Sequence, residues 1–76
     1  MGNWKPLKRR EFIKKLKKFG FQSPEPGGRH SYMRYGTYTL TLPNNKEYSV
    51  PQIKMLLSEI EHGVKKKISI DTWESL

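Results

Sequence analysis

The chain has no cysteine, only two histidines and no long apolar stretch. Without cysteine it has neither a disulfide nor a thiolate metal ligand, and nothing points to secretion. Its apolar runs are far shorter than the ~20 residues of a membrane span and shorter than the apolar stretch of a secretory signal. We therefore expect a cytoplasmic protein with no membrane partner. A length of 76 residues predicts a single domain covering residues 1–76.

Residues suited to metal binding or to carboxylate catalysis are scarce as well. The two histidines, His30 and His62, stand far apart in the sequence, and the seven acidic residues are scattered. A metal site needs several such side chains together, and hydrolysis by paired carboxylates needs two close carboxylates. We therefore expect no metal and no cofactor. His62 stands beside Gly63 near the end of an expected helix, so we interpret it as a local helix cap.

Positive charge is what the chain has in excess. Fifteen Lys and Arg against seven Asp and Glu give a net charge of +8 and a pI near 9.9. This balance favours an acidic partner, with nucleic acid first, an anionic membrane second and an acidic protein third. Eight basic residues are concentrated in the first quarter of the chain: Lys5, Lys8, Arg9, Arg10, Lys14, Lys15, Lys17 and Lys18. They form either a solvated helix face or a phosphate-binding surface, and the repulsion among so many like charges favours a phosphate partner.

The first periodic segment is a helix expected from about Lys8 to Phe19. Its apolar residues recur at i, i+1, i+4 and i+7, which places them on one stripe. That stripe consists of Phe12, Ile13, Leu16 and Phe19. Gly20 is suited to end the helix. The stripe is expected in the core, and the basic residues fill the remaining faces.

A second helix is expected after Ser49, which would serve as N-cap, with Pro51 near the first turn. Gly63 stands where a C-terminal cap belongs. The buried stripe of this helix is predicted to be Val50, Ile53, Leu56, Leu57 and Ile60. Residues 71–74 fit a capping box, which predicts a brief C-terminal helix with Trp73 docked on the core.

Between the two helices the pattern changes to that of strands. A short strand is expected at Phe21–Glu25, before a turn at Pro26–Gly28. The segments Arg29–Tyr35 and Thr37–Leu42 then read as a hairpin about Tyr35-Gly36.

The register of this hairpin decides which side chains face solvent. A two-residue turn places Met33 opposite Tyr38 on the apolar face. The polar face then carries His30, Tyr32 and Arg34, as a half-buried antiparallel sheet requires. A slip of one residue would bury His30.

The order of elements predicts an α+β domain with the succession α-β-β-β-α. A three-stranded antiparallel sheet would pack on two helices, followed by the short C-terminal helix. The double-stranded RNA-binding domain uses this layering. Because a fold alone does not assign a function, the function has to be argued from particular residues.

A glycine-rich turn delivers His30 to the start of a strand. Histidine, with an unperturbed pKa of about 6.5, can take and give protons near neutrality. RNA cleavage needs a base, an acid and cationic groups that hold phosphate charge, so His30 is the candidate catalytic residue. Arginine can clamp a phosphate, lysine adds a point charge, and tyrosine can stack on an unpaired base. The candidate RNA-binding residues are Arg29, Tyr32, Arg34, Lys46, Lys14, Lys15, Lys17 and Lys18.

Three stretches of the chain follow the order and spacing of a known family. Residues 11–21 end in Leu-x-x-x-Gly-Phe like the family's opening helix, and Gly28-Arg29-His30 stands at its Gly-Ser-His or Gly-Gly-His. Residues 42–57 match its ending, Pro-x-His … Leu … Ile-Leu. From Leu7 to Ile60 the chain thus resembles the HicA (YcfA-like) toxins, small ribonucleases of prokaryotic toxin–antitoxin pairs that cleave messenger RNA.

The resemblance implies the toxin of a type II toxin–antitoxin system. Its activity would be a metal-independent endoribonuclease that cleaves single-stranded messenger RNA with His30 as general acid or base. Its protein partner would be a cognate HicB-like antitoxin. Asn45 stands where many members have a second histidine, so the chemistry of that imidazole is absent here. Residues 61–69 are longer and more basic than the family's usual link.

Two other functions compete with the ribonuclease. A non-catalytic domain of the double-stranded RNA-binding type would need lysines at the start of the second helix. This chain has Val50-Pro51-Gln52-Ile53 there, with only Lys54 nearby. A basic amphipathic helix on a membrane surface would need for lipid the apolar stripe that the fold needs for its core. We therefore expect the ribonuclease first and an RNA-binding domain second.

Overall fold

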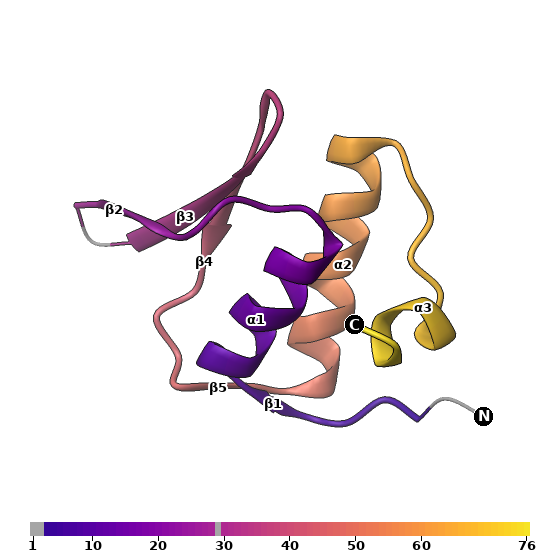
Figure 1. The fold of residues 1–76 in the computed structure, drawn as a ribbon. Helices are drawn as coiled ribbons and strands as arrows, with labels where there is room; N and C mark the ends of the chain where they lie inside the picture. The colour runs from indigo at the N-terminus through magenta and orange to yellow at the C-terminus, as the bar shows by residue number, and fades with distance from the viewer. Residues whose placement is uncertain (1–2, 29) are drawn as a thin grey trace.

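A three-stranded antiparallel sheet with helices packed on one face is the main feature of the computed structural model, which describes residues 3–28 and 30–76 (Figure 1). A second, two-stranded sheet lies at one end of the molecule. In chain order the elements are β1 (Leu7–Lys8), α1 (Arg9–Phe19), β2 (Glu25–Gly27), β3 (His30–Tyr35), β4 (Tyr38–Leu42), β5 (Glu47–Tyr48), α2 (Val50–Val64) and α3 (Ile70–Glu74). The predicted α+β class with a three-stranded antiparallel sheet is confirmed.

The first helix, α1, forms where the apolar period predicted it. Phe12 and Leu16 are fully buried, and Ile13 and Phe19 are partly buried against the core. Gly20 ends the helix with a φ of 135°, and its amide donates to the carbonyl of Leu16 at 3.0 Å. Only glycine adopts such a backbone conformation without strain. The predicted stripe and the predicted end of this helix are therefore confirmed.

The central hairpin pairs β3 with β4 in a register that differs from the predicted one. Met33 lies opposite Leu40, and Tyr35 lies opposite Tyr38. The prediction of Met33 opposite Tyr38 is wrong by two residues, because the chain turns at Gly36, with a φ of 58°, and the residue after it. An even shift keeps every side chain on its predicted face. Met33 is fully buried, and His30 is exposed.

The first strand of the sheet begins later than predicted. β2 occupies Glu25–Gly27, not Phe21–Glu25, and Pro26 pairs with Ser31. Proline is tolerated there because β2 is an edge strand, where its missing N–H costs no ladder hydrogen bond. Phe21 instead turns inward and is 4% exposed. Phe21 is therefore a core residue, and Pro26 and Gly27, which were expected in the turn, belong to the strand.

The second helix, α2, begins as predicted but ends later. The Ser49 side chain accepts a hydrogen bond from the amide of Gln52 at 3.3 Å, and Pro51 lies in the first turn. The helix continues past Gly63 to Val64, and Lys65 is its C-cap, with a φ of 58°. Gly63 is no cap. A Cβ at this position would overlap the ring of Tyr38 on β4, so the glycine lets the helix and the sheet approach closely.

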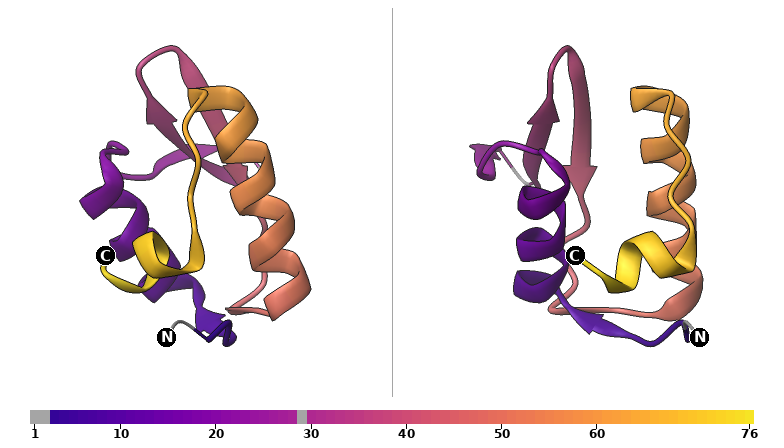
Figure 2. Two further views of the ribbon diagram at one scale, coloured as in Figure 1. Left: turned by 90° about the vertical axis from the view of Figure 1, so that its right-hand side faces the viewer. Right: turned by 45° about the vertical axis from the view of Figure 1, so that its right-hand side comes forward.

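The short helix α3 places Trp73 in the core, as predicted. Its N-cap is Ser69, which accepts from the amide of Thr72 at 3.1 Å, so the predicted capping box of residues 71–74 is wrong. The ring of Trp73 lies 5.3 Å from that of Phe12 on α1. Figure 2 shows α3 beside α1 and α2, on the side away from the three-stranded sheet. It thus closes the core opposite the sheet.

The pairing of β1 with β5 was not predicted. Leu7 lies opposite Tyr48, and Lys8 lies opposite Glu47. Tyr48 is fully buried, its ring meets Phe12 edge-on at 5.1 Å, and its hydroxyl donates to the carbonyl of Pro43 at 2.8 Å. This pair fastens the start of α1 to the connection between β4 and α2.

Candidate functional site

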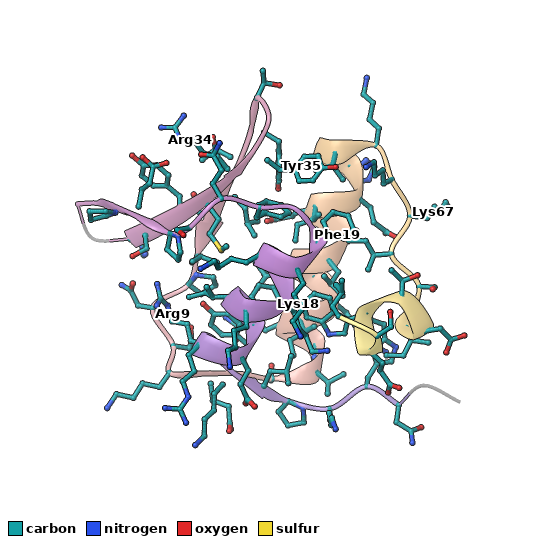
Figure 3. All side chains as sticks on the ribbon, in the orientation of Figure 1. Arg9, Lys18, Phe19, Arg34, Tyr35 and Lys67 are labelled. Carbon is teal, nitrogen blue, oxygen red and sulfur yellow. The ribbon has the colours of Figure 1, made fainter. Side chains whose placement is uncertain are left out.

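Strand β3 presents the predicted site residues on the open face of the sheet. His30, Tyr32 and Arg34 alternate with residues that face the helices, among them the fully buried Met33. His30 and Arg34 are exposed, and Tyr32 is partly buried. In Figure 3 Arg34 points away from the helices. The sequence prediction that these three side chains share one exposed face is therefore confirmed.

Arg34 is held by two neighbours on this face. Its Nε donates to Oε2 of Glu25 at 2.8 Å, and its guanidinium carbon lies 5.4 Å from the centre of the Tyr32 ring. The hydrogen bond from Arg34 to Glu25, together with the carboxylate charge, raises the pKa of Arg34. Both partners of this ion pair are nearly half exposed. Because Glu25 already accepts one N–H, Arg34 has to bind a phosphate with its remaining donors.

His30 lies at the edge of the same face, directly before Ser31 and opposite Gly27 of β2. Within residues 3–28 and 30–76, no hydrogen bond to its imidazole is found. Its backbone is set by the β2–β3 ladder, so the ring is anchored at the strand and open to solvent. The predicted phosphate ligand Arg29 lies outside the described residues.

The predicted lysines of α1 divide into two groups. Lys14, Lys17 and Lys18 are exposed. Lys15 instead reaches α3, where its Nζ donates to the carbonyl of Trp73 at 2.8 Å and to that of Leu76 at 3.3 Å. Its ammonium also lies 5.2 Å from the Trp73 ring centre. Burial lowers the pKa of Lys15, and the nearby Glu74 partly offsets this. Lys15 therefore ties α1 to α3 and to the end of the chain, and two of its three donors are already used.

Lys46 does not lie with His30 on the sheet. The amide of Arg9 donates to the Lys46 carbonyl at 2.9 Å, which places Lys46 at the start of α1. There an open groove is lined by Lys8, Arg9, Arg10, Asn44, Lys46 and Glu47. From the sequence, Lys8, Arg9 and Arg10 were predicted as part of the charge of the first helix, and the groove was not predicted. The run Lys8-Arg9-Arg10 indicates a concentration of positive charge in the sequence. Only the fold shows that Lys46 lies in the same groove.

A second proton-transfer group was not identified from the sequence. Asn45, which the resemblance to the HicA toxins aligns with a second histidine, carries an amide that transfers no proton, and its Oδ1 accepts from Nε2 of Gln52 at 3.2 Å. His62 is exposed in the last turn of α2 and lines a depression with Glu61 and residues 65–67. The part of the chain that the structure describes brings no three His, Asp or Glu side chains together in a metal-binding arrangement. His30 is thus the imidazole that shares its strand face with Tyr32 and Arg34.

Comparison with protein families, with curated proteins and with solved structures finds no significant match to this chain. Among the helices formed by residues 3–28 and 30–76, none has the length and apolar character needed to cross a membrane. Function therefore has to be argued from the geometry and charge of the chain itself.

Proposed function

We propose that this protein is a cytoplasmic endoribonuclease of the HicA type, which binds single-stranded messenger RNA on the open face of the sheet and cleaves it with His30. The observation that carries the proposal is the alternation along β3, which presents His30, Tyr32 and Arg34 together on one exposed face. A net charge of +8 supports a polyanionic substrate.

The three side chains can divide the chemistry among them. As the 2′-oxygen attacks the neighbouring phosphorus and the bond from phosphorus to the 5′-oxygen breaks, His30 would accept the 2′-hydroxyl proton while water protonates the 5′-oxygen, or would protonate the 5′-oxygen while water accepts the 2′-hydroxyl proton. Arg34 would hold a phosphate oxygen, since the charge on the phosphate grows in the transition state. The exposed part of the Tyr32 ring would stack on an unpaired base. In this scheme the protein groups replace a metal ion.

The ordered motifs of the sequence add support from a second direction. The three-stranded sheet and its flanking helices follow the α-β-β-β-α order expected of a HicA toxin, with the short strand β5 inserted between β4 and α2 and β1 preceding α1. An unregulated messenger-RNA nuclease would harm its own cell, so inhibition has to come from another protein. We propose a HicB-like antitoxin with an acidic surface that covers the face of His30, Tyr32 and Arg34, because complementary charge speeds association.

The two histidines provide a matched test. We expect His30→Ala to abolish cleavage of single-stranded RNA and to change the unfolding free energy by less than about 1 kcal/mol, because exposed side chains contribute little packing. His62→Ala removes the other exposed imidazole and should cleave as the parent does. Product formation on a labelled RNA, with and without EDTA, is the measurement. Undiminished cleavage by His30→Ala would exclude the histidine from the mechanism, and loss of activity in EDTA would exclude metal independence.

A non-catalytic RNA-binding domain is the second candidate. It is favoured by one observation, the Asn45–Gln52 hydrogen bond at the position where the family has its second imidazole. The same assay separates the two functions. RNA that binds to the parent and to both histidine variants but is never cut would establish the binding domain.

A further inference from the structure

The basic groove at the start of α1 is built from two distant segments of the chain. Lys8, Arg9 and Arg10 come from β1 and the first turn of α1, and Asn44, Lys46 and Glu47 come from the connection before α2. The β1–β5 pairing and the hydrogen bond from the Arg9 amide to the Lys46 carbonyl hold the two segments together. Figure 3 shows Arg9 beside the connection between β4 and β5. The groove is thus a folded surface and not a flexible basic tail.

The positive charge in this groove is only partly offset within the chain. It contains four cations and one carboxylate, Glu47. Among the described residues, the ion pair with N···O within 4 Å is Arg34–Glu25, so none of the four groove cations has such a partner. The amides of Lys8 and Arg9 already donate to Glu11 and to Lys46, so side chains supply the charge. Four unpaired cations in one concavity repel one another, and a polyanion relieves this repulsion.

The lining distinguishes among acidic partners. Each of the six lining side chains is charged or polar. A protein partner is usually held by buried aromatic or aliphatic anchors, which this groove lacks. A phosphate backbone needs only cations and donors, and the arginines can hold its oxygens in two-pronged contacts. The charged and polar lining of the groove therefore fits the phosphate backbone of a nucleic acid.

The groove also lies within a short reach of His30. Leu42, the last residue of β4, lies opposite Ser31, next to His30. From Leu42 the chain leads directly to Lys46, and four residues span at most about 14 Å. An extended strand of a few nucleotides can therefore contact both places.

We propose that this groove binds phosphates of the same RNA strand whose scissile bond lies at His30, a few nucleotides away. The inference rests on the proposed function for its ligand, and it adds a second contact area that fixes the strand relative to the histidine. Binding at the groove supplies affinity and orientation, and the sheet face supplies chemistry.

Two double variants that remove equal charge test the groove. Arg10→Gln with Lys46→Gln removes two groove cations, and Lys65→Gln with Lys67→Gln removes two exposed cations in the link after α2. The probe is a fluorescent single-stranded 2′-O-methyl RNA of about 12 nucleotides, which lacks the attacking hydroxyl. Binding is measured by anisotropy over a range of salt concentrations. Cleavage plays no part in this readout, so failure of the ribonuclease leaves the groove test intact.

The expected result is a difference in salt dependence. Loss of two phosphate contacts should flatten the log–log slope by about 1.4, since each contact with a single strand contributes about 0.7. The control pair should keep the parent's slope. Equal slopes in the two double variants would overturn the inference, because net charge alone would then explain binding. The inference would also be overturned if the parent protein did not bind this RNA but bound anionic vesicles. Conversely, a flattened slope without any cleavage would retain the groove and reject the nuclease.

Discussion

The two ends of α1 make opposite kinds of contact. At its C-terminal end, Phe19, Phe21 and Tyr35 pack with ring centres 5.3–6.2 Å apart, and Tyr38 joins them at 6.3 Å from Phe21. We call these four residues the aromatic cluster. At its N-terminal end lies the groove of unpaired cations. The rings of the aromatic cluster pack on one another, whereas the groove cations form no ion pair among the described residues.

This difference separates stability from recognition along a single helix. Rings in close contact stabilise the fold through burial and aromatic packing. Unpaired cations contribute little to stability and much to the attraction of polyanions. Substitutions at the aromatic cluster should therefore change the unfolding free energy, and substitutions at the groove should change binding.

The largest effect on stability is expected from Gly63→Ala. An alanine is usually favourable in a helix by up to ~1 kcal/mol. Here its Cβ would overlap the Tyr38 ring, so we expect a net loss of about 2 kcal/mol or more from overpacking. Urea unfolding measures this loss.

A double-mutant cycle sharpens the same prediction. If the overlap is the cause, Gly63→Ala should be far less costly in a Tyr38→Ala background, because the ring that it would meet is gone. RNA binding by Gly63→Ala below its melting temperature should match the parent. A Gly63→Ala variant as stable as the parent would mean that the helix and the hairpin are not held in close contact.

Substitution of Lys15 tests whether the middle of α1 contributes to the stability of the fold or to the binding of RNA. Lys15→Gln removes one hydrogen bond to Trp73 of α3 and one to Leu76 beyond it, and we expect a loss of about 1 kcal/mol. Lys14→Gln removes the same charge from the next position, which is exposed, and should leave stability nearly unchanged. Urea unfolding of both variants gives the comparison. Equal stabilities would show that the contacts with Trp73 and Leu76 do not hold α3.

The smallest effect is a loss of stability at alkaline pH. Burial raises the pKa of Tyr48, with the nearby Arg9 charge offsetting part of the shift, and burial also raises the pKa of Tyr38. Unfolded tyrosine ionises near pH 10. The folded chain retains these protons to higher pH, so the contribution is complete below about pH 10 and is lost as pH rises through the folded pKa values.

Tyr48→Phe isolates the contribution of Tyr48 to this effect. The variant lacks the ionisable hydroxyl, so its unfolding free energy should fall less steeply than that of the parent between about pH 9 and pH 11. It should also be about 1 kcal/mol less stable at neutral pH, because the bond to the Pro43 carbonyl is lost. Parallel pH profiles would mean that Tyr48 does not titrate differently in the folded and unfolded chain.

Local patterns were sufficient to predict the helices, the hairpin and the exposed face of β3. An apolar period and an alternation are properties of neighbouring residues, so Phe12, Leu16 and His30 were assigned to the correct faces. The hairpin register was predicted wrongly because both candidate turns contain Gly36 and keep the same face buried. Alternation alone cannot choose between registers that differ by two residues.

Long-range contacts could not be predicted from local sequence patterns. β1 and β5 have two residues each, too few for any period, and they pair across about forty intervening positions. The groove depends on that pairing and was missed with it. Lys15 was placed with the RNA-binding lysines because its partners, Trp73 and Leu76, are at the far end of the chain. Gly63 was interpreted as a cap because its contact with Tyr38 is not visible in the sequence.

The pairing of Leu7 with Tyr48 has a further consequence for the order of folding. Contacts between distant positions carry the loop-closure cost of all the chain between them, and they form late unless other contacts have already shortened that loop. The hydrogen bond from the Arg9 amide to the Lys46 carbonyl completes this closure. An anion held by cations from both segments would stabilise the closed arrangement by mass action. Binding at the groove and the final step of folding would then be one coupled equilibrium, and the Arg9 amide would report on both through its hydrogen exchange.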